Sequence, residues 1–166
     1  FASNEDASSA FNFRTSGTVT VKPQDENSFS SAFNTSSLSY TGITGLVIGH
    51  ADNTANITIG NATNIAGPVT IYGGNIAINS PLTATNDIIR LTATGNVTQS
   101  AVLSASNLSL NGTGAFALQN GGNDVDVLAA GSISERVGNI SYRNSDAFQI
   151  GTVGSQSGIF GSGTVL

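Results

Sequence analysis

Three residue types are missing from the chain: cysteine, methionine and tryptophan. Without cysteine there is neither a disulfide framework nor a thiolate metal site, although this absence is compatible with any compartment. Charged residues are also scarce, at 9% of the 166 residues against roughly 25% in an ordinary globular protein. Thr, Ser and Asn must therefore cover much of the surface, and these side chains suit half-exposed strands and the turns beside them.

Positive charge is sparse and scattered, which bears on possible partners. The formal net charge is −5, and the five basic residues are Arg14, Lys22, Arg90, Arg136 and Arg143. Nucleic acid and anionic membranes need a clustered basic footprint, so we expect neither as a partner. No apolar run approaches the ~20 residues of a membrane span, and the N-terminus lacks the layout of a signal peptide. We therefore expect no membrane span, and we expect any export signal to lie outside this chain.

Apolar and polar residues alternate over most of the chain, which is typical of strands with one buried face. Gly, Asn, Ser and Pro separate the bursts of alternation, and these residues favour turns over helices. The sequence therefore predicts an all-β protein. The alternating pairs are Leu46/Ile48, Ile57/Ile59, Val69/Ile71, Ile76/Ile78, Ile89/Leu91, Leu108/Leu110, Phe116/Leu118, Val125/Val127, Ile140/Tyr142 and Phe148/Ile150.

A short start sequence recurs about every 20 residues. Gly74-Asn75-Ile76 returns as Gly95-Asn96-Val97 and again as Gly138-Asn139-Ile140, with related starts at residues 106–108 and 122–125. Short strands within such a period are typical of a parallel β-solenoid, also called a β-helix. We expect about eight coils, stacked at ~4.8 Å into a rod on the order of 40 Å long. Residues 17–166 form the predicted solenoid, and residues 1–16 form a less regular arm, either flexible or paired with a neighbouring unit.

An antiparallel sandwich is the competing fold, because it also has many short strands with frequent turns. Its hairpins would carry Asn-Gly or Asp-Gly between paired strands. Asn111-Gly112 and Asn120-Gly121 fit that pattern, but the other breaks read Gly-Asn, in the opposite order. The order of these breaks favours the solenoid.

Two long stretches resemble a known family. "SFSSAFNTSSLSYTGITGLVIGHADNTANITIGNATNIAGPVTIYGGNIAINSPLTAT" (28–85) is similar to the repeat units of very large bacterial exoproteins of the filamentous haemagglutinin type. "GNISYRNSDAFQIGTVGSQSGI" (138–159) is similar to a coil that recurs downstream in such proteins. The resemblance implies a right-handed parallel β-helix, exported by a two-partner-secretion-like route and acting outside the cell as a surface adhesin or fibre. It also implies an internal segment or processed subunit of a longer protein, with no catalytic residues.

The two ends of the predicted solenoid read alike: "FRTSGTVTV" (13–21) and "IFGSGTVL" (159–166). A solenoid whose ends match presents two strand edges that can pair with each other, and isolated domains normally blunt such edges. We therefore expect the chain to be its own partner, stacking end to end through edges near 13–21 and 159–166. Two further functions stay open at this point: a glycan-binding solenoid module and an ice-binding solenoid.

No residue of the sequence is assigned a catalytic, cofactor-binding or metal-binding role. Gly73-Gly74 lacks the following helix or Lys of a phosphate loop, so we predict a corner at which glycine supplies a positive φ. Asp124 and Asp126, in "NGGNDVDVL" (120–128), faintly resemble a Ca²⁺-binding nonapeptide, but such sites need several successive copies. We expect both carboxylates to be solvated.

Enzymatic candidates are few and dispersed. Polysaccharide-cleaving β-helices need convergent carboxylates, and the candidates are Asp87 with Arg90, and Glu135 with Arg136 and Arg143. His50 is the only histidine and hence the only candidate base of a Ser-His-Asp triad. We expect these groups to be ordinary surface residues and the protein to be no enzyme.

Three repeated polar features remain. The pairs Thr18/Thr20, Thr83/Thr85 and Thr92/Thr94 carry the ice-binding alternative, whereas Tyr40, Tyr72 and Tyr142 are the aromatic candidates for glycan binding. Asn-x-Ser/Thr triplets are glycan acceptors in a suitable host, but an Asn corner followed by an apolar-Thr/Ser strand produces the same triplet. The triplets begin at Asn34, Asn56, Asn61, Asn96, Asn107, Asn111 and Asn139.

Overall fold

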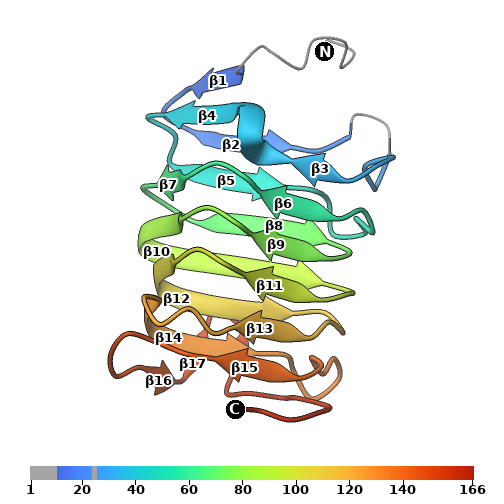
Figure 1. The fold of residues 1–166 in the computed structure, drawn as a ribbon, viewed down its shortest axis with the longest axis vertical. Coiled ribbons are helices and arrows are strands. Elements are labelled where there is room, and N and C mark those ends of the chain that lie inside the picture. The colour runs from blue at the N-terminus through green and yellow to red at the C-terminus, as the bar shows by residue number, and fades with distance from the viewer. Residues whose placement is uncertain (1–10, 24–25) are drawn as a thin grey trace.

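The computed structural model describes residues 11–23 and 26–166, and in it the chain winds as a right-handed parallel β-helix of about six coils (Figure 1). The fold class predicted from the sequence is therefore confirmed. The strands are β1 (Phe11–Arg14), β2 (Thr18–Val21), β3 (Phe33–Asn34), β4 (Leu38–Thr41), β5 (Gly45–Ile48), β6 (Ile57–Ile59), β7 (Thr63–Ile65), β8 (Val69–Gly73), β9 (Ile76–Ile78), β10 (Leu82–Ala93), β11 (Val97–Gln99), β12 (Leu103–Asn111), β13 (Phe116–Leu118), β14 (Asp124–Ala130), β15 (Ile140–Tyr142), β16 (Gln149–Ile150), β17 (Thr152–Val153) and β18 (Gln156–Ser157). A short 3-10 helix, η1 (Thr35–Ser37), follows β3.

Two parallel sheets form the walls of the β-helix. The eight-stranded sheet has the order β16-β14-β12-β10-β8-β5-β2, with β7 beside β10, and the six-stranded sheet has the order β15-β13-β11-β9-β6-β3. Every pair in these two sheets is parallel, and the single antiparallel pair of the described chain is the hairpin β17-β18. This pairing excludes the antiparallel sandwich. Asn111-Gly112 ends β12 and Asn120-Gly121 lies between β13 and β14, so neither closes a hairpin.

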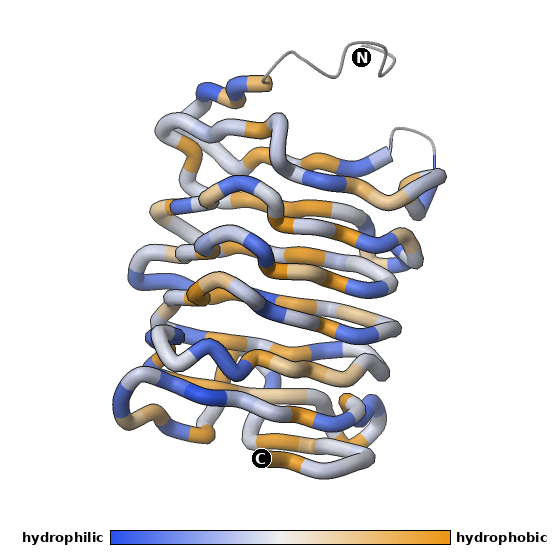
Figure 2. Tube along the Cα trace, viewed as in Figure 1, coloured by the Kyte–Doolittle hydropathy of each residue, from blue (hydrophilic) through white to orange (hydrophobic). Residues whose placement is uncertain are grey.

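Inward-facing side chains stack into columns along the axis, and Figure 2 shows the hydrophobic segments recurring from coil to coil. In the six-stranded sheet one column runs through Phe33, Ile57, Ile76, Val97, Phe116 and Ile140, each in register with the next. The members from Ile57 to Ile140 are at most 2% exposed. Each such side chain contributes about 1.5–3 kcal/mol by leaving water, so these columns hold the coils together.

The coil number is about six rather than the expected eight. The three Gly-Asn starts do precede members of one column, but the start between them is Gly114-Ala115-Phe116, which lacks the Asn. The starts at 106–108 and 122–125 belong to β12 and β14, in the other sheet. Counting them as coil starts shortens the apparent period, whereas polar contacts between adjacent coils join residues 19 to 29 apart. Six coils at ~4.8 Å give a rod of about 30 Å.

Gly73-Gly74 forms the corner between β8 and β9, as predicted, but for a different reason. Positive φ occurs at other glycines and not at these two. Coils are instead in close contact here, because a Cβ on Gly74 would lie 2.1 Å from the carbonyl oxygen of Thr54 in the preceding coil. A Cβ on Gly73 would be 3.0 Å from the buried side chains of Ile57 and Ile76. The pair is thus required by packing between coils.

The β-helix includes part of the segment predicted as an arm. β1 pairs in parallel with β4, so residues 11–14 already belong to a coil. The sequence had placed these residues in the predicted arm, residues 1–16. Residues 1–10, which carry the rest of that prediction, lie outside the described residues.

Candidate functional site

The C-terminal end of the β-helix exposes the continuation of its core columns. Ile150 is in register with buried Leu128, and Val165 bridges to buried Ile140. Ile150, Val165 and Leu166 are 60%, 46% and 78% exposed. Figure 2 shows this hydrophobic end around the C-terminus. The alternation predicted buried positions at Phe148 and Ile150, and they are exposed because no described coil covers them.

The N-terminal end carries aromatic rings instead. Phe29 and Phe33 stack with centroids 4.6 Å apart, and Phe13 and Tyr40 stack at 5.9 Å. All four are partly buried against the core. The described strands β2 and β3 are the edge strands of their sheets at this end. The two ends therefore differ in chemistry: stacked aromatic rings dominate one, and the other exposes the aliphatic side chains of Ile150, Val165 and Leu166 beside Phe148.

The two similar end sequences do not occupy equivalent places. Val19 pairs with Leu46 in the eight-stranded sheet, whereas Val165 bridges to Ile140 of the six-stranded sheet. Their common Gly-Thr-Val therefore does not define the phase of the coil. The order of the strands along the chain defines the phase instead. A short corner strand, β4 or β7, follows a strand of the six-stranded sheet. β1 pairs with β4 and so occupies the same corner position. Thus the position after residues 164–166 is the position that β1 occupies.

A groove lies on the outer face of the eight-stranded sheet, beside a hairpin that the sequence did not predict. The chain leaves the coil after β16, forms β17-β18 and returns to bridge Ile159 to Ala130. Val153 of the hairpin packs on Ile88 and Ala129 in a second apolar cluster outside the coils. The hairpin thereby forms one wall of a groove of about 320 Å³.

Gln156 fixes this hairpin to the sheet. Its amide nitrogen donates to the carbonyl oxygens of Leu110 (3.2 Å) and Gly131 (3.1 Å) and to Oδ1 of Asn111 (2.8 Å). Its amide oxygen accepts from the hydroxyl of Ser109. The hairpin is therefore held by four hydrogen bonds from one side chain as well as by the packing of Val153.

The floor of the groove is built from outward-facing residues of neighbouring strands. Thr70 of β8 is in register with Arg90 of β10, and Tyr72 with Thr92. Arg90 reaches toward the hairpin, since a Cβ on Gly154 would lie 3.8 Å from its Nη2. Glu135 also lines the groove. One cation, one carboxylate, an aromatic ring and the hydroxyls of several Thr and Ser residues therefore share this surface.

The groove brings together two candidates that the sequence had placed in separate clusters, Arg90 and Glu135. The other members lie elsewhere. Oδ1 of Asp87 accepts from the amide of Ile88 in a bulge of β10, and Nη1 of Arg136 donates to the carbonyl of Gly161. Arg143 lies beside Gly121, outside the groove. The predicted clusters Asp87–Arg90 and Glu135–Arg136–Arg143 are not assembled: no ion pair joins their members anywhere in the described chain.

Asp124 and Asp126 are exposed at a different corner. They line a shallow cavity of about 200 Å³ with hydroxyl groups of β10 and β12, next to Asn86, which has a φ of 55°. Within the described ranges no group of three His, Cys, Asp or Glu residues converges as a metal site. The two carboxylates are solvated, as the sequence suggested.

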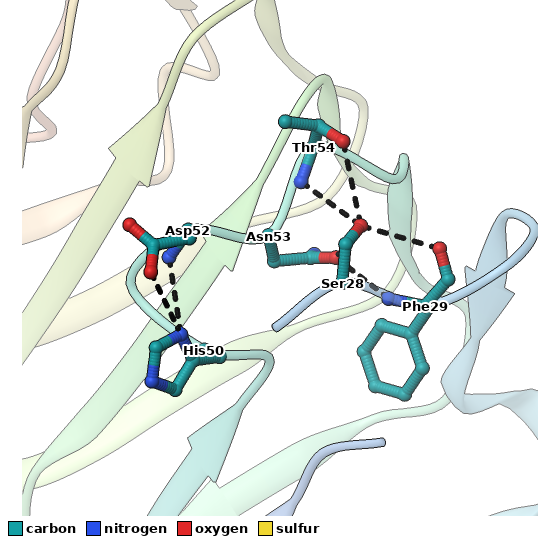
Figure 3. Close-up of polar contacts among 6 residues, drawn as sticks. All are labelled: Ser28, Phe29, His50, Asp52, Asn53 and Thr54. Carbon is teal, nitrogen blue, oxygen red and sulfur yellow. Dashed lines mark hydrogen bonds and ion pairs between the residues drawn. The ribbon is translucent and has the colours of Figure 1, made fainter. Parts of the chain in front are cut away.

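His50 lies in a polar corner with Ser28 and Asp52, but the three do not form a triad (Figure 3). Nδ1 of His50 is 3.5 Å from the Asp52 carboxylate and also accepts from the Asp52 amide at 3.3 Å. The hydroxyl of Ser28 donates to Oδ1 of Asn53 (2.9 Å) and accepts from the amide of Thr54 (3.1 Å). No hydrogen bond joins Ser28 to His50 among the contacts of Figure 3, so these two residues are not arranged as the nucleophile and base of a triad.

The corner around Asn53 is structural. This buried asparagine receives Ser28 and Phe29 on Oδ1 and donates to the carbonyl of Tyr72 in the next coil at 2.7 Å. Asn123 has the same structural role further along the rod. Its side-chain nitrogen donates to the carbonyls of Leu118 and Arg143. Both residues are buried, and their side chains join adjacent coils through hydrogen bonds.

The threonine pairs do not form one rank. Thr18 is in register with Gly45, Thr83 with Asn64 and Ser104, and Thr92 with Tyr72 and Asn111. A flat ice-binding face needs threonines opposite threonines from coil to coil, and the register neighbours of Thr18, Thr83 and Thr92 are other residues. The arrangement therefore disfavours the ice-binding alternative.

The tyrosines also lie apart. Tyr40 is at the N-terminal end, Tyr72 is in the groove, and Tyr142 packs edge-on against Phe148 at 5.1 Å and donates to Asn144. Burial raises the pKa of Tyr40 to about 12, and burial, with Asp124 and Asp146 nearby, raises the pKa of Tyr142 further. No aromatic row exists along the described strands, and Tyr72 is the tyrosine that lines the groove.

Two of the seven glycan triplets belong to a ladder of asparagines. Oδ1 of Asn56 accepts from the amide and side chain of Asn75, and Oδ1 of Asn75 accepts from the amide of Asn96. Asn56 and Asn96 begin triplets, whereas Asn75 holds the same position without one. The fold therefore accounts for these two triplets without any glycan.

Comparisons with known proteins add no relative. No family model matches the chain, and neither a curated protein nor a solved structure shows significant similarity to it. In the described part of the chain no helix has the length and apolar character needed to cross a membrane. Any function must therefore be argued from the β-helix itself.

Proposed function

We propose that the protein is a non-enzymatic building block of a bacterial surface fibre or large adhesin, acting as a subunit or internal repeat outside the cell. The observation that carries this proposal is the open C-terminal end, where core columns continue into exposed Ile150, Val165 and Leu166. Unblunted strand edges with apolar side chains pair readily with further strands. We infer that the next coil comes from a second copy of this chain, stacked head to tail.

Head-to-tail stacking joins two different surfaces, so repeated contacts form a filament rather than a closed dimer. The aliphatic end of one copy would lie on the aromatic end of the next, where Phe29 and Phe33 head the core column. The winding supports this geometry, because β1 occupies the position that follows residues 164–166. Export and adhesion rest on the resemblance to filamentous haemagglutinin-type repeats and are part of the proposal.

The non-enzymatic role is supported by the dispersal of the charged groups. Asp87, Asp124 and His50 lie at separate corners, each engaged with its own backbone or with solvent. General acid–base catalysis needs such groups within hydrogen-bond reach of one substrate. Structural use of the fold requires no convergence of this kind.

Sedimentation velocity and negative-stain electron microscopy of the purified chain test the stacking. We expect concentration-dependent association and filaments with an axial repeat near the rod length of about 30 Å. The double variant Ile150→Lys/Leu166→Lys should stay monomeric, because it places charge on the stacking surface. The control Ile133→Lys replaces an equally exposed isoleucine in the loop after β14 and should still assemble. A wild-type chain that stays a compact monomer at high concentration would refute the stacking.

The alternative function, a glycan-binding module, gains support from one feature, the groove beside the hairpin. An aromatic row would have favoured recognition of a long chain along the rod. A single groove with one tyrosine favours a small saccharide unit instead.

A further inference from the structure

We propose that the groove between the hairpin β17-β18 and the outer face of the eight-stranded sheet binds a sugar that carries one carboxylate, of the uronic acid class. The groove measures about 320 Å³. Small-ligand sites begin near ~300 Å³, so the groove suits a single sugar ring better than a long chain. This site is separate from the stacking ends, and its proposal does not rest on stacking.

The groove is formed before any ligand arrives. Four hydrogen bonds of Gln156 and the packing of Val153 hold the hairpin in place. The floor consists of residues of three in-register strands, β8, β10 and β12. A wall and floor that are already ordered reduce the entropy lost on binding, which favours affinity for a small ligand.

The side-chain amides that hold the hairpin already form hydrogen bonds within the protein. A ligand can therefore use only the other polar groups of the groove. Gln156 uses its donors on protein atoms, and Asn111 bonds to Ser109 and Gln156. Arg90 has no ion-pair partner within the described ranges, although Glu135 lines the same groove. The groups facing the groove are therefore the guanidinium of Arg90, the carboxylate of Glu135, the ring of Tyr72 and the hydroxyls of Thr70, Thr92 and Ser155.

This set matches an acidic sugar. A guanidinium binds a carboxylate through two parallel hydrogen bonds. A carboxylate such as Glu135 and the two threonine hydroxyls accept from sugar hydroxyl groups. The ring of Tyr72 offers an apolar face with a polar end, to which the C–H face of a pyranose can pack.

Other anionic ligands fit less well. A nucleic acid needs several cations along its backbone, and Arg90 is the single basic residue that lines the groove. Glu135 would repel a second negative charge on the same ligand. The net charge of −5 gives no long-range attraction for polyanions either. One carboxylate among many hydroxyls is the combination that the groove accommodates.

A titration followed by ¹H–¹⁵N NMR tests the proposal with a matched pair of ligands, methyl glucuronide and methyl glucoside, which differ only in the carboxylate. We expect methyl glucuronide to shift amide signals of β10, β12 and residues 153–156, and to bind at least about tenfold more tightly than methyl glucoside. Sodium acetate in a third titration should not reproduce these shifts at the same concentration. The protein is kept below the concentration at which copies associate, so the result is independent of stacking.

Variants locate the site. Arg90→Gln should weaken methyl glucuronide binding at least about tenfold, and Glu135→Gln should weaken it several-fold. Arg143→Gln removes an arginine outside the groove and should change nothing. Unfolding midpoints of all three variants establish that the fold is retained, since each side chain is on the surface. The proposal is overturned if no groove signal shifts, if methyl glucoside or acetate acts equally well, or if Arg90→Gln binds like the wild type.

Discussion

At the residue scale, each inward-facing side chain belongs to a column and touches the coil above and the coil below. Ile76 is completely buried between Ile57 and Val97, and Phe116 holds the same position two coils further on. Thr70 alternates with the core and faces outward, half-exposed, in the groove. Whether a side chain points into or out of the coil, rather than which strand carries it, therefore decides how much stability a substitution removes.

Ile76→Asp and Phe116→Asp should prevent folding or lower the unfolding free energy by more than about 4 kcal/mol, because each buries an unpaired carboxylate in an apolar column. Thr70→Ala should change it by less than about 0.5 kcal/mol, as is usual for surface sites. Thermal unfolding followed by circular dichroism measures all three. Equal melting temperatures for the three variants would contradict the inward and outward assignment.

Tyr40 makes the stability depend on pH in the alkaline range. Its folded pKa is raised to about 12 by burial, whereas an unfolded tyrosine titrates near 10. Between pH 10 and 12 the unfolded chain therefore loses a proton that the folded chain keeps, so stability falls as the pH rises through this window. Tyr40→Phe should make that fall smaller in urea unfolding measured from pH 8 to 12.

Tyr142 provides the contrast. Its pKa is raised in the same direction, so Tyr142→Phe should also reduce the alkaline loss. At neutral pH the two variants should differ. The Tyr142 hydroxyl donates to Asn144 at 2.6 Å, and its removal should cost about 0.5–1.5 kcal/mol. The buried Tyr40 hydroxyl has no partner among the described residues, so Tyr40→Phe should be neutral or stabilising at pH 7. A destabilised Tyr40→Phe at pH 7 would contradict this account.

At the element scale, alternation in the sequence predicted the strands of the coils well, because one face of each strand is buried and the other is wet. It failed where a strand bends around a corner. Val125 is buried inside the coil, but β14 then turns, so that Val127 packs outside under the hairpin and Leu128 faces inward. Such a bend interrupts the strict alternation of inward and outward side chains. No residue pattern in the sequence marks the position of the bend.

The groove was beyond sequence reasoning for a related reason. Arg90 and Glu135 are brought together by two coils of winding, and the wall beside them is a hairpin outside the repeat. One signal was present: three glycines at 151, 154 and 158 interrupt the repeat, and the last two have positive φ. Such spacing indicates turns, but it does not say which face of the rod they cover.

We expect the coils to fold without the hairpin, because it lies outside their stacked core. Gln156→Ala removes its four hydrogen bonds, leaves the carbonyls of Leu110 and Gly131 without this partner, and should cost about 1–3 kcal/mol. Amide hydrogen exchange should accelerate at residues 152–157 while the coils keep their protection. Gln119→Ala, which removes a single exposed contact to Ser141, is the control and should leave exchange unchanged. Loss of protection throughout the coils in Gln156→Ala would mean that the hairpin is needed for the β-helix itself.

At the scale of the whole molecule, stacked coils contact their immediate neighbours, as in other repeat proteins, and the hairpin β17-β18 additionally packs across several coils. The sequence predicted this architecture because repetition is visible without structure, but it overcounted the coils because Gly-Asn corners occur on both sheets. Local opening in such a stack begins where one neighbour is missing. For the isolated chain, protection from exchange should be highest in β8 to β13 and decline toward both ends. Uniform protection along the rod would indicate instead that the coils unfold as one unit.

The parallel pairing of the coils has a mechanical consequence. All hydrogen bonds of the two sheets lie along the rod, so a load applied between its ends acts on the coils in series, and the weakest terminal coil detaches first. A detached coil of 19 to 29 residues can extend to roughly 60–100 Å, at ~3.3–3.6 Å per residue, in exchange for about 5 Å of rod. A rod of this kind lengthens in steps and dissipates work at each step, while the coils that are still stacked keep their shape.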